Sequence, residues 1–351
     1  MAYTTINKST AHFNTKLYTG NAATNRGITG VGFQPDLTWI KARSDSTWHH
    51  LFDAVRGANK ALNSNSTGNE GTVATFPSFD SDGFTVNGAS GGNLNINNQT
   101  NASWNWKAGT SVSGNSGGSG TAKSYTGSVN TTAGFSIIKY IGNGASGHTI
   151  PHHLGAIPQM MIIKNLTTGS TNWMIYHKTM GNTKAIYFTD ASQDIDAGWW
   201  NNTSPTSSVF TLGNHANHNA NNNSMIAYCF ADVKGYSKMG GYKGNNQTGS
   251  NSPFIYTGFT PSFLMVKKIS DTNHWIIWDN KRSTKNGKNI IDKKLYANIN
   301  NAENGNDDVS FLSNGFKFNT NTGDWNATED YLYMCFGQSI VGSNDTPATA
   351  R

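Results

Sequence analysis

The chain has 351 residues, of which only 13% are charged and 11% are aromatic, and its formal net charge at pH 7 is +6. The aromatic content excludes a disordered chain, and no run approaches the roughly 20 apolar residues of a membrane span, so we expect no membrane insertion. The mild positive charge comes without a nucleic-acid recognition motif, which argues against a nucleic-acid partner. The N-terminal stretch MAYTTINKSTAHFN has neither the basic start nor the apolar segment of a secretory signal peptide, so we expect synthesis in the cytoplasm.

Three stretches of the chain carry the same features in the same order. Each begins with Tyr-x-Gly-Asn, and a later glycine stands three residues before a proline, the prolines being Pro35, Pro158 and Pro261. Each proline opens an apolar strand that ends in a lysine six residues later, and the lysines are Lys41, Lys164 and Lys267. A tryptophan-bearing strand, a loop, a hairpin and a closing strand follow in every copy. This order of features predicts a triplicated module.

The local patterns predict strands and tight turns. Trp48, Trp173 and Trp275 lie in short apolar runs that we place at equivalent positions of the three copies. Asp-Gly at 82–83 and Asn-Gly at 314–315 supply the positive φ angles of hairpin turns. No stretch shows a sustained helical period. We therefore expect an all-β protein of three tandem β-sandwich modules, of the jelly-roll type.

The repeats also predict where the modules begin and end. We expect the first repeat, with an N-terminal arm, at 1–107, the second at 134–235 and the third at 236–340. Residues 108–133 are rich in Gly, Ser and Thr, which is typical of a flexible linker or a long surface loop. Residues 341–351 are expected to form an extended C-terminal arm.

One pair of opposite charges recurs in two copies. Arg56 follows Asp53 by three residues, and Arg282 follows Asp279 in the same way. The recurrence favours a structural bridge that holds a loop, and an arginine that faces a ligand is the alternative.

The two cysteines, Cys229 and Cys335, occupy the same place in the second and third copies. Equivalent positions in separate modules seldom meet, so the spacing predicts two free thiols and no disulfide bond.

The sequence gives no sign of a catalytic site, a metal site or a cofactor. The three glutamates, Glu70, Glu303 and Glu329, are far apart, whereas glycoside hydrolysis needs two carboxyl groups close together. His215 and His218 lack the further ligands that a zinc site requires. We therefore expect a protein that is not an enzyme.

Candidate contacts for a glycan lie in the second copy. Trp199 and Trp200 form a pair found in that copy alone, and exposed indole faces stack on sugar rings, although buried core tryptophans are the alternative. We group His215 and His218 with them as candidate glycan-binding residues, while plain surface histidines are the alternative. The basic run at 281–294 is expected to be a solvated hairpin or a contact for a polyanion.

Several of these segments together resemble a known family. MAYTTINKST, GFQPDLTWIKAR, SFDSDGFTV, WNWKAG, NNTSPTSSVF, IAYCFADVKGYSKMGGYKGN and the terminal PATAR are similar to tandem-repeat virion structural proteins of marine tailed phages, including cyanophages. Such proteins are described as tail-fibre-like or as having lectin-like, concanavalin-type sandwich domains. The resemblance spans nearly the whole chain and supplies no catalytic residue.

The resemblance implies a protein of the virion exterior, released by lysis, that takes part in host attachment. Weak sites repeated across chains would then act together by multivalency. The implied partners are further copies of the chain, as a homotrimer if it is a fibre, other virion proteins of the tail or capsid, and host surface polysaccharide. A capsid decoration or head-fibre protein is the first alternative, and a glycan depolymerase is the second.

Overall fold

The computed structural model describes residues 3–88, 94–189, 192–285, 289–306 and 308–342. The chain forms antiparallel sheets, so the expected all-β sandwich class is confirmed. The helical elements of the described residues are single turns: η1 (Ser9–Ala11), α1 (Ala216–Asn219) and η2 (Gly249–Asn251). None of the helices in these residues is long and apolar enough to cross a membrane.

Three large sheets share one strand order, in which the first strand of a repeat pairs with its last strand and the last pairs with the proline-led strand. In the first repeat the order is β1 (Phe13–Thr19), β9 (Thr100–Trp106), β3 (Leu37–Ala42) and β4 (His50–Asp53). In the second it is β13 (Phe135–Ile141), β20 (Ser224–Ala231), β15 (Pro158–Asn165), β16 (Met174–His177), β17 (Lys184–Tyr187) and β18 (Asp194–Ile195). In the third it is β21 (Ser237–Lys243), β29 (Asp330–Gln338), β23 (Thr260–Lys268), β24 (Ile276–Asp279) and β26 (Lys294–Tyr296).

A smaller sheet accompanies each large one. The first consists of β2 (Arg26–Thr29), β8 (Gly83–Val86) and β7 (Ser78–Asp80). The second consists of β11 (Gly117–Gly118), β14 (His148–Pro151) and β19 (Val209–Leu212). The third consists of β22 (Phe254–Tyr256), β28 (Gly315–Phe318), β27 (Val309–Leu312) and β25 (Ile290–Ile291). A two-stranded ribbon of β5 (Lys60–Ala61) and β6 (Gly71–Thr72) lies beside β4.

The three prolines stand at one place in the strand register. The residues two positions after them, Leu37, Met160 and Phe263, pair with the equivalent residues Trp106, Phe230 and Phe336. In the second and third repeats the register shifts between the proline and this residue. Proline has no N–H to donate, so a bulge at the start of a central strand is where it is tolerated.

Residues 108–133 do not form the predicted linker or loop. They contain β10 (Thr110–Asn115), β11 and β12 (Ser124–Asn130), and β10 and β12 extend the second large sheet beyond β13. Tyr125, Gly127 and Val129 alternate with the polar residues of β12, and Tyr125 and Val129 face the core. The Gly/Ser/Thr composition hid this alternation, which is the strand signal that the prediction missed.

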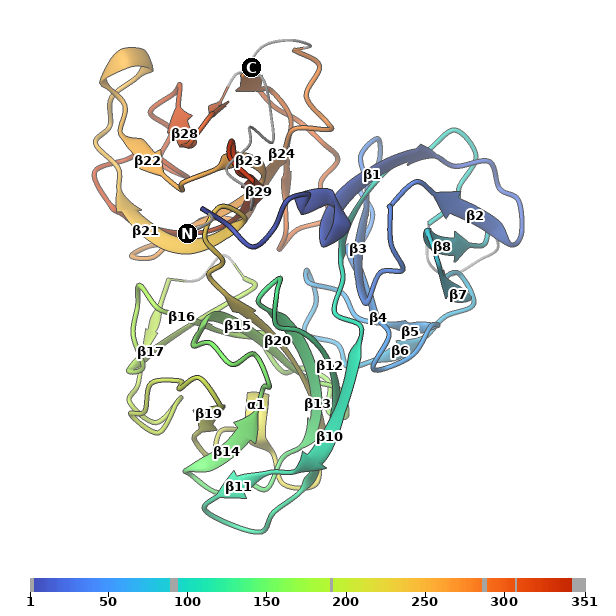
Figure 1. Ribbon diagram of the computed structural model, residues 1–351, viewed down its shortest axis with the longest axis vertical. Helices are drawn as coiled ribbons and strands as arrows, with labels where there is room; N and C mark the ends of the chain where they lie inside the picture. Colours follow the sequence, from blue (N-terminus) through green and yellow to red (C-terminus); the bar gives the residue numbers. More distant parts are fainter. Residues whose placement is uncertain (1–2, 89–93, 190–191, 286–288, 307, 343–351) are drawn as a thin grey trace.

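The large sheets pack against each other through their inner faces. One continuous core, the central core, contains residues of all three, and the three lobes surround it (Figure 1). Its aromatic centre includes Phe13, Trp106, Phe230 and Phe336, with ring centroids 5.1 Å apart for Phe13 and Phe336 and 6.0 Å apart for Phe230 and Phe336. The outer face of each large sheet packs on its small sheet in a core of its own. Burial on both faces explains why the proline-led strands are mostly apolar between the proline and the lysine.

The N-terminal segment joins the first lobe to the third. The backbone N–H of Ser9 donates to Oε1 of Gln338 over 2.7 Å, and Nε2 of Gln338 donates to the carbonyl of Asn7 over 3.1 Å. The Tyr3 hydroxyl donates to the carbonyl of Gly258 over 2.8 Å. Ile6 is buried in the central core. The first and third lobes are not consecutive in the sequence. The N-terminal segment links them and so closes the ring of lobes.

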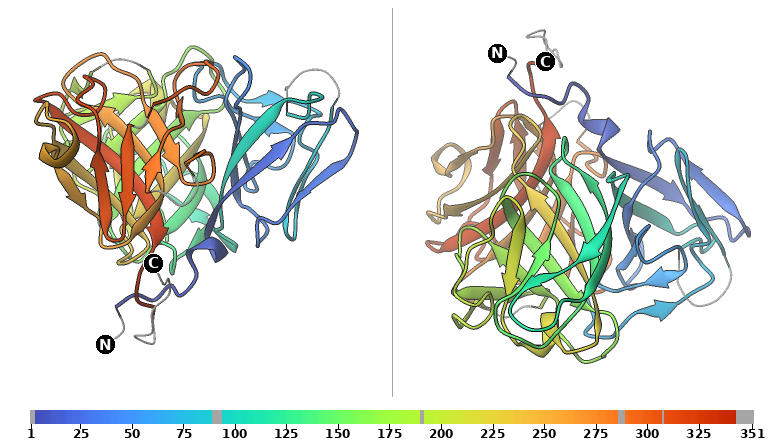
Figure 2. Two further views of the ribbon diagram at one scale, coloured as in Figure 1. Left: turned by 90° about the horizontal axis from the view of Figure 1, so that it is seen from above. Right: turned by 60° about the horizontal axis from the view of Figure 1, so that its bottom comes forward.

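The molecule has two different ends. At the terminal end, β1 begins beside the last residue of β9, since Phe13 pairs with Trp106, and the described segments before β1 and after β29 leave the lobes on this side (Figure 2). At the distal end, β1 finishes at Thr19, which pairs with Thr100. The start of β4 lies at this distal end as well, because His50 pairs with Ile40 near the end of β3.

Candidate functional site

Contacts between the lobes recur around the ring. We call the boundaries between the first and second, second and third, and third and first repeats the first, second and third seams. At the first seam, Nε1 of Trp173 donates to the carbonyl of Asn63 over 3.0 Å. At the second, Nε1 of Trp275 donates to the carbonyl of Tyr187 over 2.7 Å. The two indoles therefore hold equivalent carbonyl groups of the preceding lobe.

At the third seam the equivalent residue is His49, so the expected equivalence of Trp48 with the other two tryptophans is wrong. His49 stands four residues before Asp53, as Trp275 stands four before Asp279 in the matching pairing register. Its Nδ1 accepts from Trp39 Nε1 over 2.9 Å, which leaves the hydrogen on Nε2. Trp48 instead points outward and is 50% exposed.

The recurrent Asp–Arg pairs are buried inside the seams. Nε of Arg56 donates to Oδ2 of Asp53, and Nε of Arg282 donates to Oδ2 of Asp279 over 2.5 Å, with all four side chains buried. The Nη2 groups donate to strand carbonyls of β4 and β24. The structural bridge is therefore the correct interpretation, because both guanidinium groups are buried in the protein.

The neighbouring lobe completes each ion pair. The Tyr228 hydroxyl donates to Asp53 Oδ2 over 2.7 Å, and Nε1 of Trp104 donates to Asp279 Oδ2 over 2.9 Å. At the second seam the aspartate is replaced by His177, whose Nε2 lies 3.2 Å from the carbonyl of Tyr333. That seam is held by uncharged groups.

A third position also differs between the two seams with ion pairs and the neutral seam. Backbone N–H groups at equivalent places donate across the seams, from Glu70 to Leu166, from Gln193 to Ile269 and from Glu303 to Arg43. The two ion-pair seams have glutamate there, and the neutral seam has glutamine. Glu70 and Glu303, which are far apart in sequence, are therefore structural counterparts.

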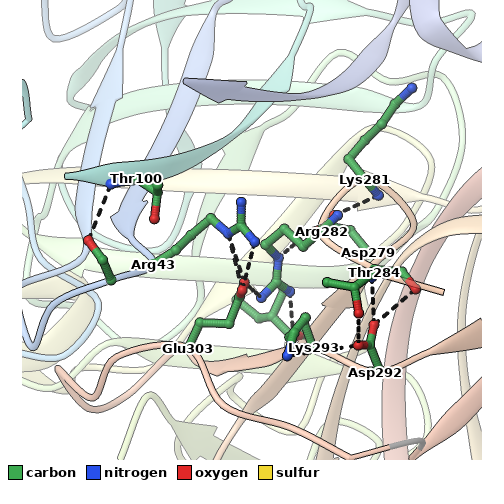
Figure 3. A network of polar contacts seen from close by, with 12 residues as sticks. Arg43, Thr100, Asp279, Lys281, Arg282, Thr284, Asp292, Lys293 and Glu303 are labelled. Atoms are coloured by element: carbon green, nitrogen blue, oxygen red, sulfur yellow. Dashed lines mark hydrogen bonds and ion pairs between the residues drawn. The ribbon is translucent and has the colours of Figure 1, made fainter. Parts of the chain in front are cut away.

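Figure 3 shows the third seam, where Glu303 binds two guanidinium groups. Arg43 donates to it over 2.8 Å from Nη2, and Arg282 donates over 2.9 Å from Nη1. Asp292 lies nearby and accepts hydrogen bonds from Thr284.

The basic run at 281–294 is not an open cationic surface over its described residues. Arg282 is buried in the third seam, Lys294 Nζ lies 2.7 Å from Asp308, and Lys293 Nζ lies 3.8 Å from Asp292. Lys288 lies outside the described residues. These pairings remove much of the charge that a polyanion contact would use.

The three repeated lysines are buried and bind carbonyl groups of distal-end loops. Lys41 Nζ donates to the carbonyl of Asp45 over 2.9 Å, Lys164 Nζ to that of Thr67 over 2.9 Å, and Lys267 Nζ to that of Asp271 over 3.0 Å. Burial lowers the pKa of Lys41 and of Lys164 to about 8. The ammonium groups hold the distal loops in place.

The predicted glycan-binding residues do not form a surface site. Trp199 is 5% exposed and Trp200 is 1% exposed, and both belong to the core between the second large sheet and its small sheet. His218 is buried, with Nε2 donating to the carbonyl of Trp199 over 2.8 Å. Only His215 is exposed, and its ring centroid lies 4.0 Å from that of Trp199. The alternative of core tryptophans is therefore correct, because a sugar cannot reach either indole face.

Cys229 and Cys335 are free and buried, as predicted. Burial raises the pKa of the Cys229 thiol to about 12, so this thiol is unreactive at neutral pH. In the parts of the chain that the structure describes, no three His, Cys, Asp or Glu residues gather as metal ligands would.

A cavity of about 650 Å³ lies where the added hairpin β10–β12 meets the first repeat. Its carboxylate, Asp36, accepts from the backbone N–H of Ala108 over 2.8 Å and from Ser128 Oγ over 3.1 Å. Burial raises the pKa of Asp36 above its ordinary value. The carboxylate therefore fastens the hairpin, and the rest of the cavity is lined by a mixture of hydroxyl and amide groups, small apolar residues and Lys107.

A second cavity, the distal pocket of about 460 Å³, lies where the three lobes meet at the distal end. It is lined by Asn65, Thr189 and Asn298, which stand at equivalent positions of the three repeats. Phe188 also lines it and is otherwise buried.

Phe188 closes the centre of the molecule below the distal pocket. Its ring centroid lies 5.6 Å from Trp39, 5.9 Å from Trp173 and 5.1 Å from Trp275, one indole from each lobe. The equivalent residues are Ser64 and Ala297. One large and two small side chains thus share a place where three large ones would collide.

Residues 8–339 match the family described as "Domain of unknown function (DUF7483)". No curated protein and no solved structure gave a significant match to the chain. The arrangement of side chains is therefore the basis for inferring a role.

Proposed function

The chain belongs to the DUF7483 family, and we propose that it is a structural and adhesion protein on the exterior of a tailed-phage particle, without enzymatic activity. The resemblance of its segments to tandem-repeat virion proteins supports this role. The structural observation that carries the proposal is the division of the molecule into two ends. The described segments before β1 and after β29 leave the lobes at the terminal end, while the distal pocket and Trp48 lie at the other.

This division suits a body that is attached at one end and presents the other. The ring of lobes is closed by its own N-terminal segment and filled by one aromatic core, so it is rigid. Attachment through the terminal end leaves the distal end facing away from the particle. Host adhesion is then assigned to the distal end.

The absence of an enzymatic role is part of the proposal. A glycan depolymerase needs two carboxyl groups that face a substrate across a few ångströms. Asp53, Asp279 and Glu303 are instead bound to arginines inside the seams. Asp36 is bound to the hairpin. These carboxylates form buried contacts that hold the lobes together.

A capsid decoration protein is the second candidate, and the closed ring favours it. A single chain already completes the three-lobed body, so it does not depend on partner chains for its core. For a fibre we keep the homotrimer as the proposed state. Light scattering at several concentrations separates the two, since a stable trimer supports the fibre and a monomer supports decoration.

Adhesion is tested with purified, fluorescently labelled protein on host cells. We expect saturable binding to host cells and none to cells of an unrelated strain, together with slower adsorption of particles when unlabelled protein is added. Binding only to particles stripped of this protein would assign decoration instead. Failure to bind either cells or particles would overturn the proposed function.

A further inference from the structure

We propose that the distal pocket, together with Trp48, binds a neutral sugar unit of a surface glycan. This inference rests on the proposed adhesion function and assigns it to particular residues. The volume of about 460 Å³ falls in the range of about 300–1,000 Å³ usual for small-molecule sites.

The described lining residues of the pocket have no acid, lysine or arginine among them; they carry amide, hydroxyl, imidazole and apolar groups. Anions and metal ions are bound by charged groups or by clustered carboxylates, which the described lining does not offer. A ligand with several hydroxyl groups and no charge matches the lining.

Asn65 has a donor available for such a ligand. Its Oδ1 accepts from the backbone N–H of His49 over 3.0 Å, which fixes the orientation of the amide. Within the described residues Nδ2 has no hydrogen-bond partner, so both of its hydrogens are available at the pocket. A sugar hydroxyl accepts such a hydrogen bond.

His274 supplies a second oriented donor. Oδ1 of Asn298 accepts from the backbone N–H of Trp275 over 3.0 Å, so its Nδ2 donates to Nδ1 of His274, which is 3.0 Å away. In the neutral imidazole the hydrogen is therefore on Nε2. Side chains of the first and third repeats thus present donors to one cavity.

The floor of the pocket and the exposed Trp48 at the same end of the molecule supply aromatic surface. Phe188 contributes part of its ring to the floor, held by the three surrounding indoles. Trp48 is the first-repeat counterpart of His274, because each stands five residues before the seam aspartate. It therefore lies at the same end of the molecule, with half of its surface open for stacking on a further sugar unit.

The first test is titration of the full chain with a panel of neutral mono- and oligosaccharides, followed by tryptophan fluorescence. The fluorescence reports on the site because Trp39, Trp173 and Trp275 surround Phe188. We expect at least one neutral sugar to bind with millimolar affinity or better, and the negatively charged glucuronate to bind at least about tenfold more weakly.

Asn65→Asp is the sharpest variant. It keeps the oxygen that accepts from His49 while removing the Nδ2 donor and adding a charge, so we expect about tenfold weaker sugar binding and a nearly unchanged melting temperature. Asn69→Asp, an equal charge change in the same loop outside the pocket, is the control and should bind as the wild type does. Trp48→Ala should weaken oligosaccharides more than monosaccharides.

The inference is overturned if no neutral sugar binds the wild type, or if Asn65→Asp and Asn69→Asp bind alike. The proposed function can be judged separately by cell binding. If Asn65→Asp with Trp48→Ala still binds host cells as the wild type does, the distal site is wrong and adhesion through another surface stands. If this double variant loses both sugar and cell binding, both proposals are supported.

Discussion

The first and second seams hold equivalent strands together with different chemistry. Both keep the same backbone hydrogen bond, from Glu70 to Leu166 in the first seam and from Gln193 to Ile269 in the second. The backbone frame is therefore independent of the charges beside it.

The side chains differ as a set. The first seam combines Asp53, Arg56 and Glu70, whereas the second has His177, Met180 and Gln193 in their places. A buried charge without its partner is costly, so an intermediate set with only one of these replacements is disfavoured. The three positions are therefore all charged in the first seam and all uncharged in the second, because their charges balance one another.

The largest expected effect comes from breaking the charged set at one position. Arg56→Met leaves Asp53 buried without its guanidinium, and we expect a loss of about 3–5 kcal/mol in the free energy of unfolding. Chemical denaturation measures it.

Replacing all three residues of the charged set tests whether they act as a unit. Asp53→His, Arg56→Met and Glu70→Gln together copy the second seam, so we expect the triple variant to be more stable than Arg56→Met alone. A triple variant as unstable as the sum of its single changes would contradict the idea of one balance.

Buried histidines should make the fold sensitive to acid, and one of them, His177, belongs to the neutral seam. Burial lowers the pKa of His177 to about 3, and those of His50, His152 and His218 to about 4. Between pH 6.5 and these values only the unfolded chain binds the protons, so stability falls as the pH falls. Each histidine contributes up to about 1.4 kcal/mol per pH unit in this window. Thermal unfolding from pH 7 to 4.5 should show the fall, and His177→Gln should make it shallower; an unchanged slope would place the proton uptake elsewhere.

The lysines at the distal end should give a smaller effect of the same origin at higher pH. The folded pKa of Lys41 and Lys164 is about 8, below the ordinary value of 10.5. Above pH 8 the unfolded chain keeps protons that the folded chain has lost, so stability rises with pH. Ionisation of unfolded tyrosines opposes this rise near pH 10, so the window is pH 8–9.5. Melting temperatures over that range should increase, and less so in Lys164→Met than in Lys267→Arg, the control in the third repeat.

The smallest effect tests the register of the third seam. Trp48→Ala should change the unfolding free energy by less than about 0.5 kcal/mol, since Trp48 is half exposed. Trp173→Ala should cost about 3–5 kcal/mol because that indole is buried in the central core. Similar losses of unfolding free energy in the two variants would mean that Trp48 is buried in the third seam.

Much of the fold could be read from local patterns. The prolines and the hairpin turns fixed the strand positions, and the recurrence of Asp53 with Arg56 revealed a buried pair. The two free cysteines followed from their equivalent places. These features are local or repeated, which is why one sequence contains enough information to find them.

The candidate site was less accessible to prediction. Trp199 and Trp200 have the same side chain whether buried or exposed, so identity alone could not separate core from surface. The distal pocket is formed by Asn65, Thr189 and Asn298, which are more than 100 residues apart and meet only because the lobes share a core. Packing between repeats leaves no local period in the sequence.

Phe188 has a consequence for the redesign of such a chain. The place where the three lobes meet holds one benzene ring and has no room for three, so three exact copies of a single unit would need small side chains there, or would leave a cavity. An averaged sequence used in all three units would meet the same obstacle. An engineered version built from three identical repeats should therefore keep different residues at the position of Ser64, Phe188 and Ala297. The centre of the molecule is the place where asymmetry between the repeats is needed.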